Sequence, residues 1–116
     1  MSRLLVHVDA AARELGVIAP SVGIISGVRV STEYPPECSS KLDAILRSIG
    51  GGHSSSEGYR DVFRRMGYDT VVPAGERLLN SFLKSGLKRI NNLVDAYNAV
   101  ALKYVAGIGL HDVARI

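Results

Sequence analysis

The sequence holds a single cysteine, Cys38, so an internal disulfide is excluded. A chain without disulfides fits a reducing compartment, and we expect a cytoplasmic protein. Cys38 follows two prolines and a glutamate at an expected helix start. A reactive thiol needs an electropositive setting, so an inert small residue is the favoured interpretation of Cys38.

Long apolar runs are also missing, and none approaches the roughly 18 residues of a membrane-spanning helix. The apolar N-terminal stretch is broken early by His7 and Asp9, which argues against a secretory signal. We therefore expect no membrane partner.

Metal-ligand spacing is absent as well. The three histidines, His7, His53 and His111, lie far apart, so we expect no metal site and no cofactor. The glycine-rich stretch "GGGHSSS" (residues 50–56) lacks the Gly-Lys-Ser/Thr ending of a phosphate-binding loop. We interpret it as a flexible loop over about residues 50–56, and Ser55 or Ser56 as the cap of the helix that follows.

The size and composition are those of one globular domain. The chain has 116 residues, 47% of them hydrophobic, and we treat residues 1–116 as a single domain. The net charge of +3 permits contact with a polyanion without requiring it.

Apolar residues at helical spacing, followed by glycine, predict most of the secondary structure. The expected helices span residues 9–16, 38–50, 56–67, 76–86 and 89–104.

The stretch "VIAPSVGIISGVRVS" (residues 17–31) has a different pattern, because it is rich in β-branched residues. Gly23 and Gly27 interrupt it, so we expect one or two strands with a kink or bulge. The predicted fold class is therefore α+β, a mixed α/β fold with a small N-terminal sheet and several helices. Residues 112–116 look like the start of a further element, which suggests a truncated domain or a partner that completes it.

Basic residues gather in the middle of the chain, and one interpretation is contact with a nucleic-acid backbone. The candidate RNA-binding residues are Arg60, Arg64, Arg65, Lys84, Lys88 and Arg89. A solvated helix face is the alternative, and charge density alone favours it.

The helix over residues 89–104 has a polar stripe that needs explanation. Asn92 and Asp95, three residues apart, predict a capping box at the helix start. Asn98 lies too far into the helix to be a cap and is a poor helix former. A largely buried Asn98 must either tie the helix to a neighbouring backbone or line a pocket.

The stretch "RINNLVDAYNAVALKYVAGIGLHDVARI" (residues 89–116), and above all "INNLVDAYNAV" and "DVARI", resembles a known family. It is similar to the B3/B4 domain, the tRNA-binding and editing domain of the phenylalanyl-tRNA synthetase β subunit. Stand-alone proteins built from that domain are closer still. The resemblance covers residues 57–116, and the second half of the family's domain has no counterpart in this sequence.

The resemblance implies a mixed α/β domain that handles the end of a tRNA and hydrolyses wrongly attached tyrosine. It implies a ligand pocket near Tyr97 and Asn98. The family's pocket histidine aligns with Gly109 without a gap and with His111 after a two-residue shift.

Three functions stay open at this point. The first is binding of tRNA or an aminoacyl end. The second is trans-editing, in which the protein acts as an aminoacyl-tRNA deacylase that hydrolyses the ester of mischarged tRNA. The third is a non-catalytic interaction module that forms a homo-oligomer and so completes the sheet.

Overall fold

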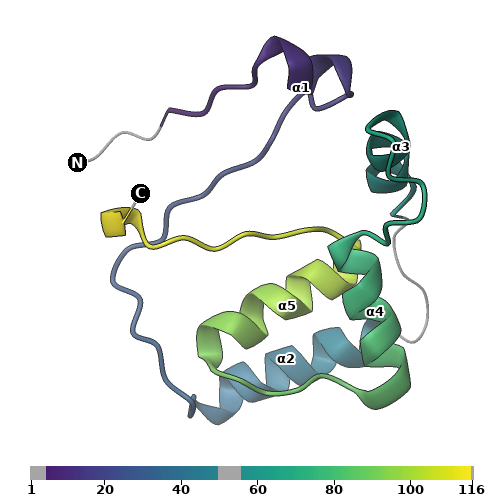
Figure 1. Ribbon diagram of the computed structural model, residues 1–116. Coiled ribbons are helices and arrows are strands. Elements are labelled where there is room, and N and C mark those ends of the chain that lie inside the picture. Colours follow the sequence, from purple (N-terminus) through teal and green to yellow (C-terminus); the bar gives the residue numbers. More distant parts are fainter. Residues whose placement is uncertain (1–4, 50–55, 116) are drawn as a thin grey trace.

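The computed structural model describes residues 5–49 and 56–115 (Figure 1). Five α-helices and one short 3₁₀ turn lie in these two stretches. They are α1 (Ala10–Glu14), α2 (Pro36–Ile49), α3 (Glu57–Arg65), α4 (Ala74–Ser85), α5 (Asn92–Tyr104) and η1 (Val113–Arg115). All five helices expected from the sequence are present, with ends shifted by a few residues.

The core is formed by three helices, with α5 in the centre packed against both α2 and α4. Its most buried apolar side chains are Ile49 of α2, Leu79 of α4, Leu102 of α5 and Val105, which follows α5. Leu46, Leu78, Phe82 and Leu87 pack around them. Removal of each of the fully buried side chains from water stabilises the fold by about 1.5–3 kcal/mol.

The predicted N-terminal sheet is wrong, because residues 5–49 and 56–115 contain no strand. Residues 17–31, which we call the N-terminal extended segment, are indeed extended, as β-branched residues favour. A strand also needs a neighbour to take its backbone hydrogen bonds. Within the described stretches, the backbone groups of residues 18–28 make none. Gly27 has a φ of 72°, which fits the kink expected there.

The predicted loop over residues 50–56 lies outside the described residues, except for Ser56. Ser56 occupies the N-cap position of α3, as expected, but its hydroxyl makes no capping hydrogen bond. Instead, Ser56 Oγ donates to Glu76 Oε2 of α4 (2.6 Å). The serine therefore joins two helices rather than capping one.

A close backbone approach fixes the angle between α4 and the end of α5. A Cβ atom added to Gly75 would lie 2.6 Å from the carbonyl carbon of Val105. Val105 itself has left-handed backbone angles (φ 50°, ψ 45°), which a β-branched residue rarely adopts. This turn sends residues 106–112, the C-terminal extended segment, back along α5 (Figure 1).

Across the described stretches, every helix is too short or too polar to cross a membrane.

Candidate functional site

The start of α5 is capped by Asn91, one residue before the predicted Asn92. Asn91 Oδ1 accepts a hydrogen bond from the backbone N–H of Val94 (2.8 Å). Two adjacent asparagines make the position of a cap ambiguous in a sequence. The backbone decides it here, because Asn91 is extended and Asn92 is already helical.

Asn92 instead holds the N-terminal extended segment. Its Oδ1 accepts from the backbone N–H of Ser31 (2.8 Å), and its Nδ2 donates to the carbonyl of Arg29 (2.9 Å). The backbone N–H of Asn92 also donates to the carbonyl of Ser31 (2.9 Å). The residue thus supplies three hydrogen bonds that a neighbouring strand would otherwise make, and it ends the unpaired part of the segment.

Asp95 is a buried structural carboxylate, with 1% of its surface exposed. Its Oδ1 accepts from the backbone N–H of Ile90 (2.8 Å), and its Oδ2 accepts from the hydroxyl of Tyr34 (2.9 Å). The predicted capping box between Asn92 and Asp95 is wrong, because Asp95 accepts from the N–H of Ile90, before the helix, and the N–H of Asn92 donates to Ser31. The contact with Tyr34 ties α5 to the residues that precede α2.

Arg89 extends this network from Tyr34 to α2. Its guanidinium donates to Tyr34 Oη (2.8 Å) and to Asp43 Oδ1 (2.6 Å). Burial lowers the pKa of Arg89, but the hydrogen bonds to Tyr34 and Asp43 outweigh it and leave the pKa raised. Arg89, one of the predicted RNA-binding residues, therefore has a structural role.

Three of the four predicted pocket residues lie around one cavity of about 620 Å³, which we call the Tyr97 cavity. Tyr97 comes from α5, and Gly109 and His111 come from the C-terminal extended segment. The N-terminal extended segment supplies a third wall. The other lining residues are Ser21, Val22, Gly23, Ile25, Leu93, Ala96, Val100, Ile108 and Leu110.

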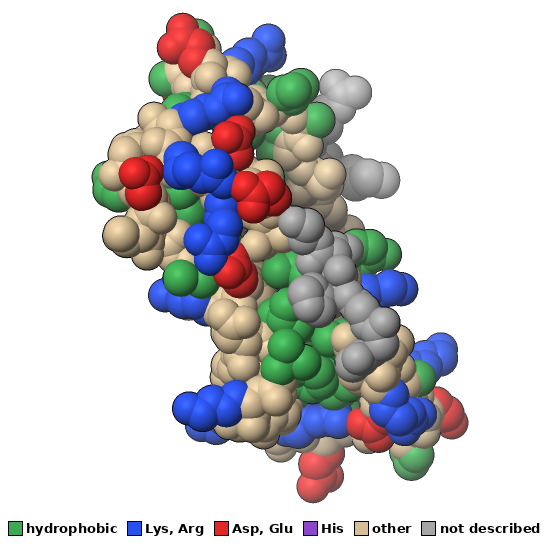
Figure 2. All heavy atoms as spheres, turned by 90° about the vertical axis from the view of Figure 1, so that its right-hand side faces the viewer, with side chains coloured by type: hydrophobic (Ala, Val, Ile, Leu, Met, Phe, Trp, Pro, Cys, Tyr) green, Lys and Arg blue, Asp and Glu red, His purple; other side chains and the backbone are tan. Residues whose placement is uncertain are grey.

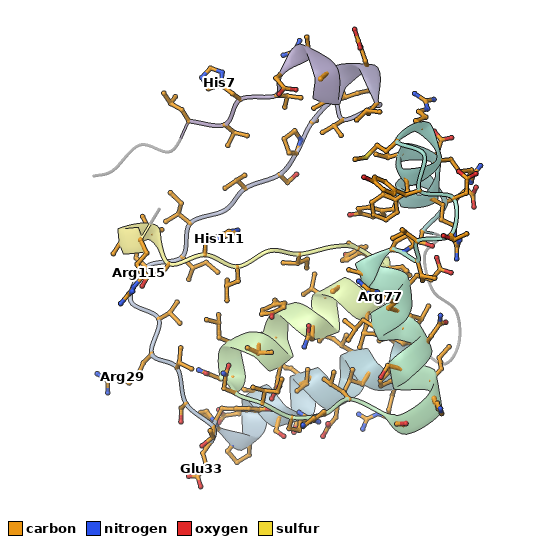
Figure 3. The ribbon with its side chains drawn as sticks, viewed as in Figure 1. His7, Arg29, Glu33, Arg77, His111 and Arg115 are labelled. Carbon is orange, nitrogen blue, oxygen red and sulfur yellow. The ribbon has the colours of Figure 1, made fainter. Side chains whose placement is uncertain are left out.

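His111 lies where the two extended segments meet (Figure 3). It lines the Tyr97 cavity and an adjoining cavity of about 500 Å³, which also contains Asp112 and Val113. Among the described residues of the Tyr97 cavity, His111 is the one imidazole, and none is a carboxylate. The arrangement is a half-open, largely apolar pocket with a few polar groups, which is the usual character of a small-ligand site.

Asn98 faces the other side of α5, so it does not share a cavity with Tyr97. It lines a space of about 310 Å³ between α4 and α5, which we call the Asn98 cavity, together with Ser81, Ser85 and Lys88. Its side chain is half-buried and makes no hydrogen bond within the described stretches, so the alternative of a structural tie gains no support. Neighbours in a helix point about 100° apart, which is why sequence adjacency misled here.

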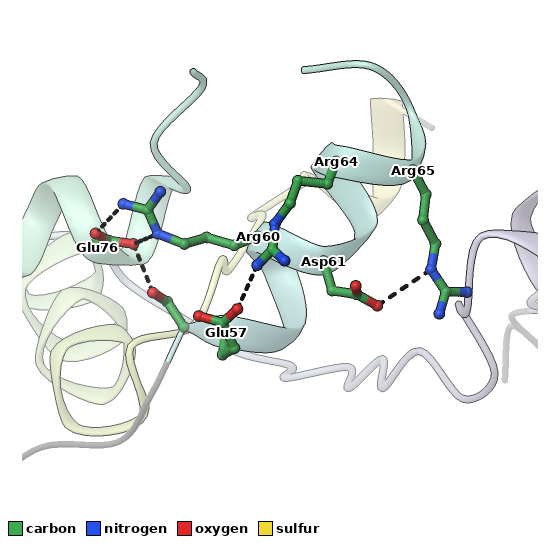
Figure 4. A network of polar contacts seen from close by, with 7 residues as sticks. Glu57, Arg60, Asp61, Arg64, Arg65 and Glu76 are labelled. Atoms are coloured by element: carbon green, nitrogen blue, oxygen red, sulfur yellow. Dashed lines mark hydrogen bonds and ion pairs between the residues drawn. The ribbon is translucent and has the colours of Figure 1, made fainter. Parts of the chain in front are cut away.

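Most of the predicted RNA-binding arginines are held in ion pairs (Figure 4). On α3, Arg64 pairs with Glu57, and Arg65 Nε lies 3.2 Å from Asp61 Oδ2. Figure 2 shows the acidic and basic side chains interleaved on this side of the molecule. Lys84 and Lys88 make no ion pair with the described residues.

Arg60 joins α3 to α4 through Glu76. The two side chains form a paired contact in which Arg60 Nε donates to Glu76 Oε2 (2.8 Å) and Arg60 Nη2 donates to Oε1. The hydrogen bond from Arg60, and then that from Ser56, lowers the pKa of the Glu76 carboxyl. This three-residue cluster links α3 to α4 through polar side chains.

Comparison of the chain with protein-family models, with curated proteins and with solved structures found no match.

Proposed function

We propose that this chain binds the aminoacyl end of a tRNA, with the amino-acid side chain in the Tyr97 cavity. The observation that supports this proposal is the convergence of Tyr97, Gly109 and His111, from two elements, on one apolar cavity. Its volume of about 620 Å³ falls within the range of small-ligand pockets, about 300–1,000 Å³.

The chemistry of the lining suits an apolar or aromatic amino acid. Leu93, Val100 and Ile108 offer apolar contact to its side chain. The Tyr97 hydroxyl and the His111 imidazole can hydrogen-bond to the ester or the ribose, because each can donate and accept. Hydrolysis of the ester would need a positioned base, and the described lining holds no carboxylate to orient His111. Binding without turnover is therefore the expected activity.

Phosphate contacts are expected from the cations that are not already paired. Lys84 and Lys88 qualify, and so does Arg29, which follows the cavity wall on the N-terminal extended segment. The arginines of α3 would have to exchange a carboxylate for a phosphate, so we expect a smaller contribution from them.

Filter binding of tyrosyl-tRNA and of uncharged tRNA, at two salt concentrations, tests the proposal. We expect binding that weakens as salt rises, with a preference for the charged form. Tyr97→Ala and His111→Ala should remove the preference, whereas the matched change Asn98→Ala should keep it, because Asn98 faces the other side of α5. Tyrosine release measured in the same reactions reports any hydrolysis.

Three outcomes would contradict the proposal. The first is no tRNA binding at low salt, since phosphate contacts are strongest there. The second is equal affinity for charged and uncharged tRNA. The third is loss of the preference in Asn98→Ala but not in Tyr97→Ala, which would place the ligand in the Asn98 cavity.

A further inference from the structure

The chain exposes much more surface than a compact protein of its mass. Its accessible surface is 8974 Å². A folded monomer of this size exposes roughly 6,100 Å², so about 2,800 Å² is in excess. The radius of gyration is 16.2 Å, against about 13 Å for a compact chain of this length. The excess is larger than the roughly 800 Å² that each partner buries in a typical stable complex.

Large apolar side chains of the two extended segments are part of this exposed surface. Ile18, Val22, Ile24 and Ile25 are exposed in the N-terminal extended segment. Ile108 and Leu110 are exposed in the C-terminal one. Apolar side chains exposed together, rather than scattered singly, are typical of an interaction site.

The backbone of the N-terminal extended segment is also without partners. Residues 18–28 make no backbone hydrogen bond with the described parts of the chain, whereas the Asn92 side chain satisfies Arg29 and Ser31. Such an edge is a template for another strand. Pro20 has no N–H to donate, and Gly27 breaks the regular extension, so residues 21–26 form the usable edge.

Charge indicates which strand would pair with this edge. No residue from Val17 to Val28 is charged, and neither is any residue from Val105 to Leu110. Natural sheet edges are normally protected against self-pairing by charged side chains, and this one is not. Two copies of residues 21–26 can therefore lie antiparallel across a two-fold axis without like-charge repulsion, and an axis near Ile24 sets the Ile24 side chains of the two copies opposite each other as a cross-strand pair.

We propose that a second copy of this chain occupies this edge, with residues 21–26 of the two copies paired as antiparallel strands about an axis near Ile24. Edge pairing uses backbone groups, so Ser21, Gly23 and Ile25 still line the Tyr97 cavity. Ile24 is 49% exposed and does not belong to the described wall of either cavity next to His111. The inference therefore stands apart from tRNA binding.

Sedimentation of the intact chain without RNA tests the interface. The wild type should sediment at twice its mass of 12.4 kDa at micromolar concentration. Ile24→Lys and Ile24→Glu should each place two like charges across the axis and weaken the dimer by about 100-fold or more. An equimolar mixture of the two variants should restore the doubled mass. Leu83→Lys, a matched change at a 56% exposed residue of α4, should leave the dimer intact.

Hydrogen exchange of the wild type gives a second readout that needs no variant. The amides of residues 21–26 should become protected as concentration rises, while those of α2 and α5 should not change. A wild type that stays monomeric would overturn the proposal, and so would Ile24 variants that still dimerise. A mixture that fails to restore the dimer, or equal disruption by Leu83→Lys, would overturn the assigned pairing.

Discussion

The helical body and the extended segments differ in how they satisfy their own backbones. Helices α2, α4 and α5 make their hydrogen bonds internally and bury one apolar stripe each. The N-terminal extended segment is similarly apolar, yet its backbone is unpaired over residues 18–28 and its large side chains are exposed. A helix in this chain therefore satisfies its backbone within one segment, whereas a strand still requires a second segment at the right place.

The contrast is tested most strongly at Leu102, whose side chain is 0% exposed at the centre of the core. Leu102→Ala should lower the free energy of unfolding by about 2–5 kcal/mol, because it removes buried methyl groups and leaves a cavity. Ile18→Ala in the extended segment, at a residue 82% exposed, should change it by less than about 0.5 kcal/mol. Urea denaturation followed by circular dichroism measures both. Equal effects would mean that the two regions are equally packed.

The second prediction concerns the crossing of α4 with the end of α5. Gly75→Ala should destabilise the fold by about 1–3 kcal/mol, because the new methyl group meets the backbone of Val105, which cannot move aside as a side chain can. Gly58→Ala is the matched control, since nothing lies within 4 Å of its Cβ position in α3. It should stabilise by about 0.4–1 kcal/mol. Thermal melts compare the two, and a neutral Gly75→Ala would contradict the close approach.

The side chain of Asn92 joins α5 to the N-terminal extended segment, and its loss should free that segment from α5. Asn92→Ala should lose two side-chain hydrogen bonds, each with a net value of about 0.5–1.5 kcal/mol. The loss should appear as faster hydrogen exchange of the Ser31 amide, with α5 unchanged. Asn92→Asp keeps the acceptor for Ser31 and should retain part of the protection, whereas Asn80→Ala on the surface of α4 should have no effect. Unchanged exchange at Ser31 in Asn92→Ala would refute the link.

The smallest expected effect is the pH dependence of the link between α3 and α4. Hydrogen bonds from Arg60 and Ser56 hold the pKa of the folded Glu76 carboxyl below its ordinary value of 4.5. A depressed folded pKa adds stability that is present above pH 4.5 and is lost as the pH falls through the folded value.

The difference in unfolding midpoint between wild type and Glu76→Gln should therefore shrink on going from neutral to about pH 3. Asn80→Ala, at an exposed and uncharged residue of α4, serves as the control and should show no such trend. A difference that stays constant with pH would show that Glu76 acts only through packing.

Periodic apolar residues and terminal glycines were enough to predict the five helices, since these signals are local. The cap of α5 was missed by one residue because Asn91 and Asn92 are equally good caps by type. The role of Asn92 could not be predicted from the sequence, because its partners Arg29 and Ser31 lie about 60 positions away in the chain. A signal for the α3 ion pairs was available in the alternation of acidic and basic residues.

The sequence by itself determined where the helices lie, which segment is extended, and that residues 17–28 carry no charge, because propensity, periodicity and charge are properties of neighbours along the chain. Only the tertiary structure decided that the extended segment forms no strand within the described chain. It also placed Tyr97 with His111 and turned Asn98 toward α4. Those outcomes depend on which distant segments come into contact. The left-handed turn at Val105 directs the C-terminal extended segment back along α5 and so brings His111 to the same cavity as Tyr97.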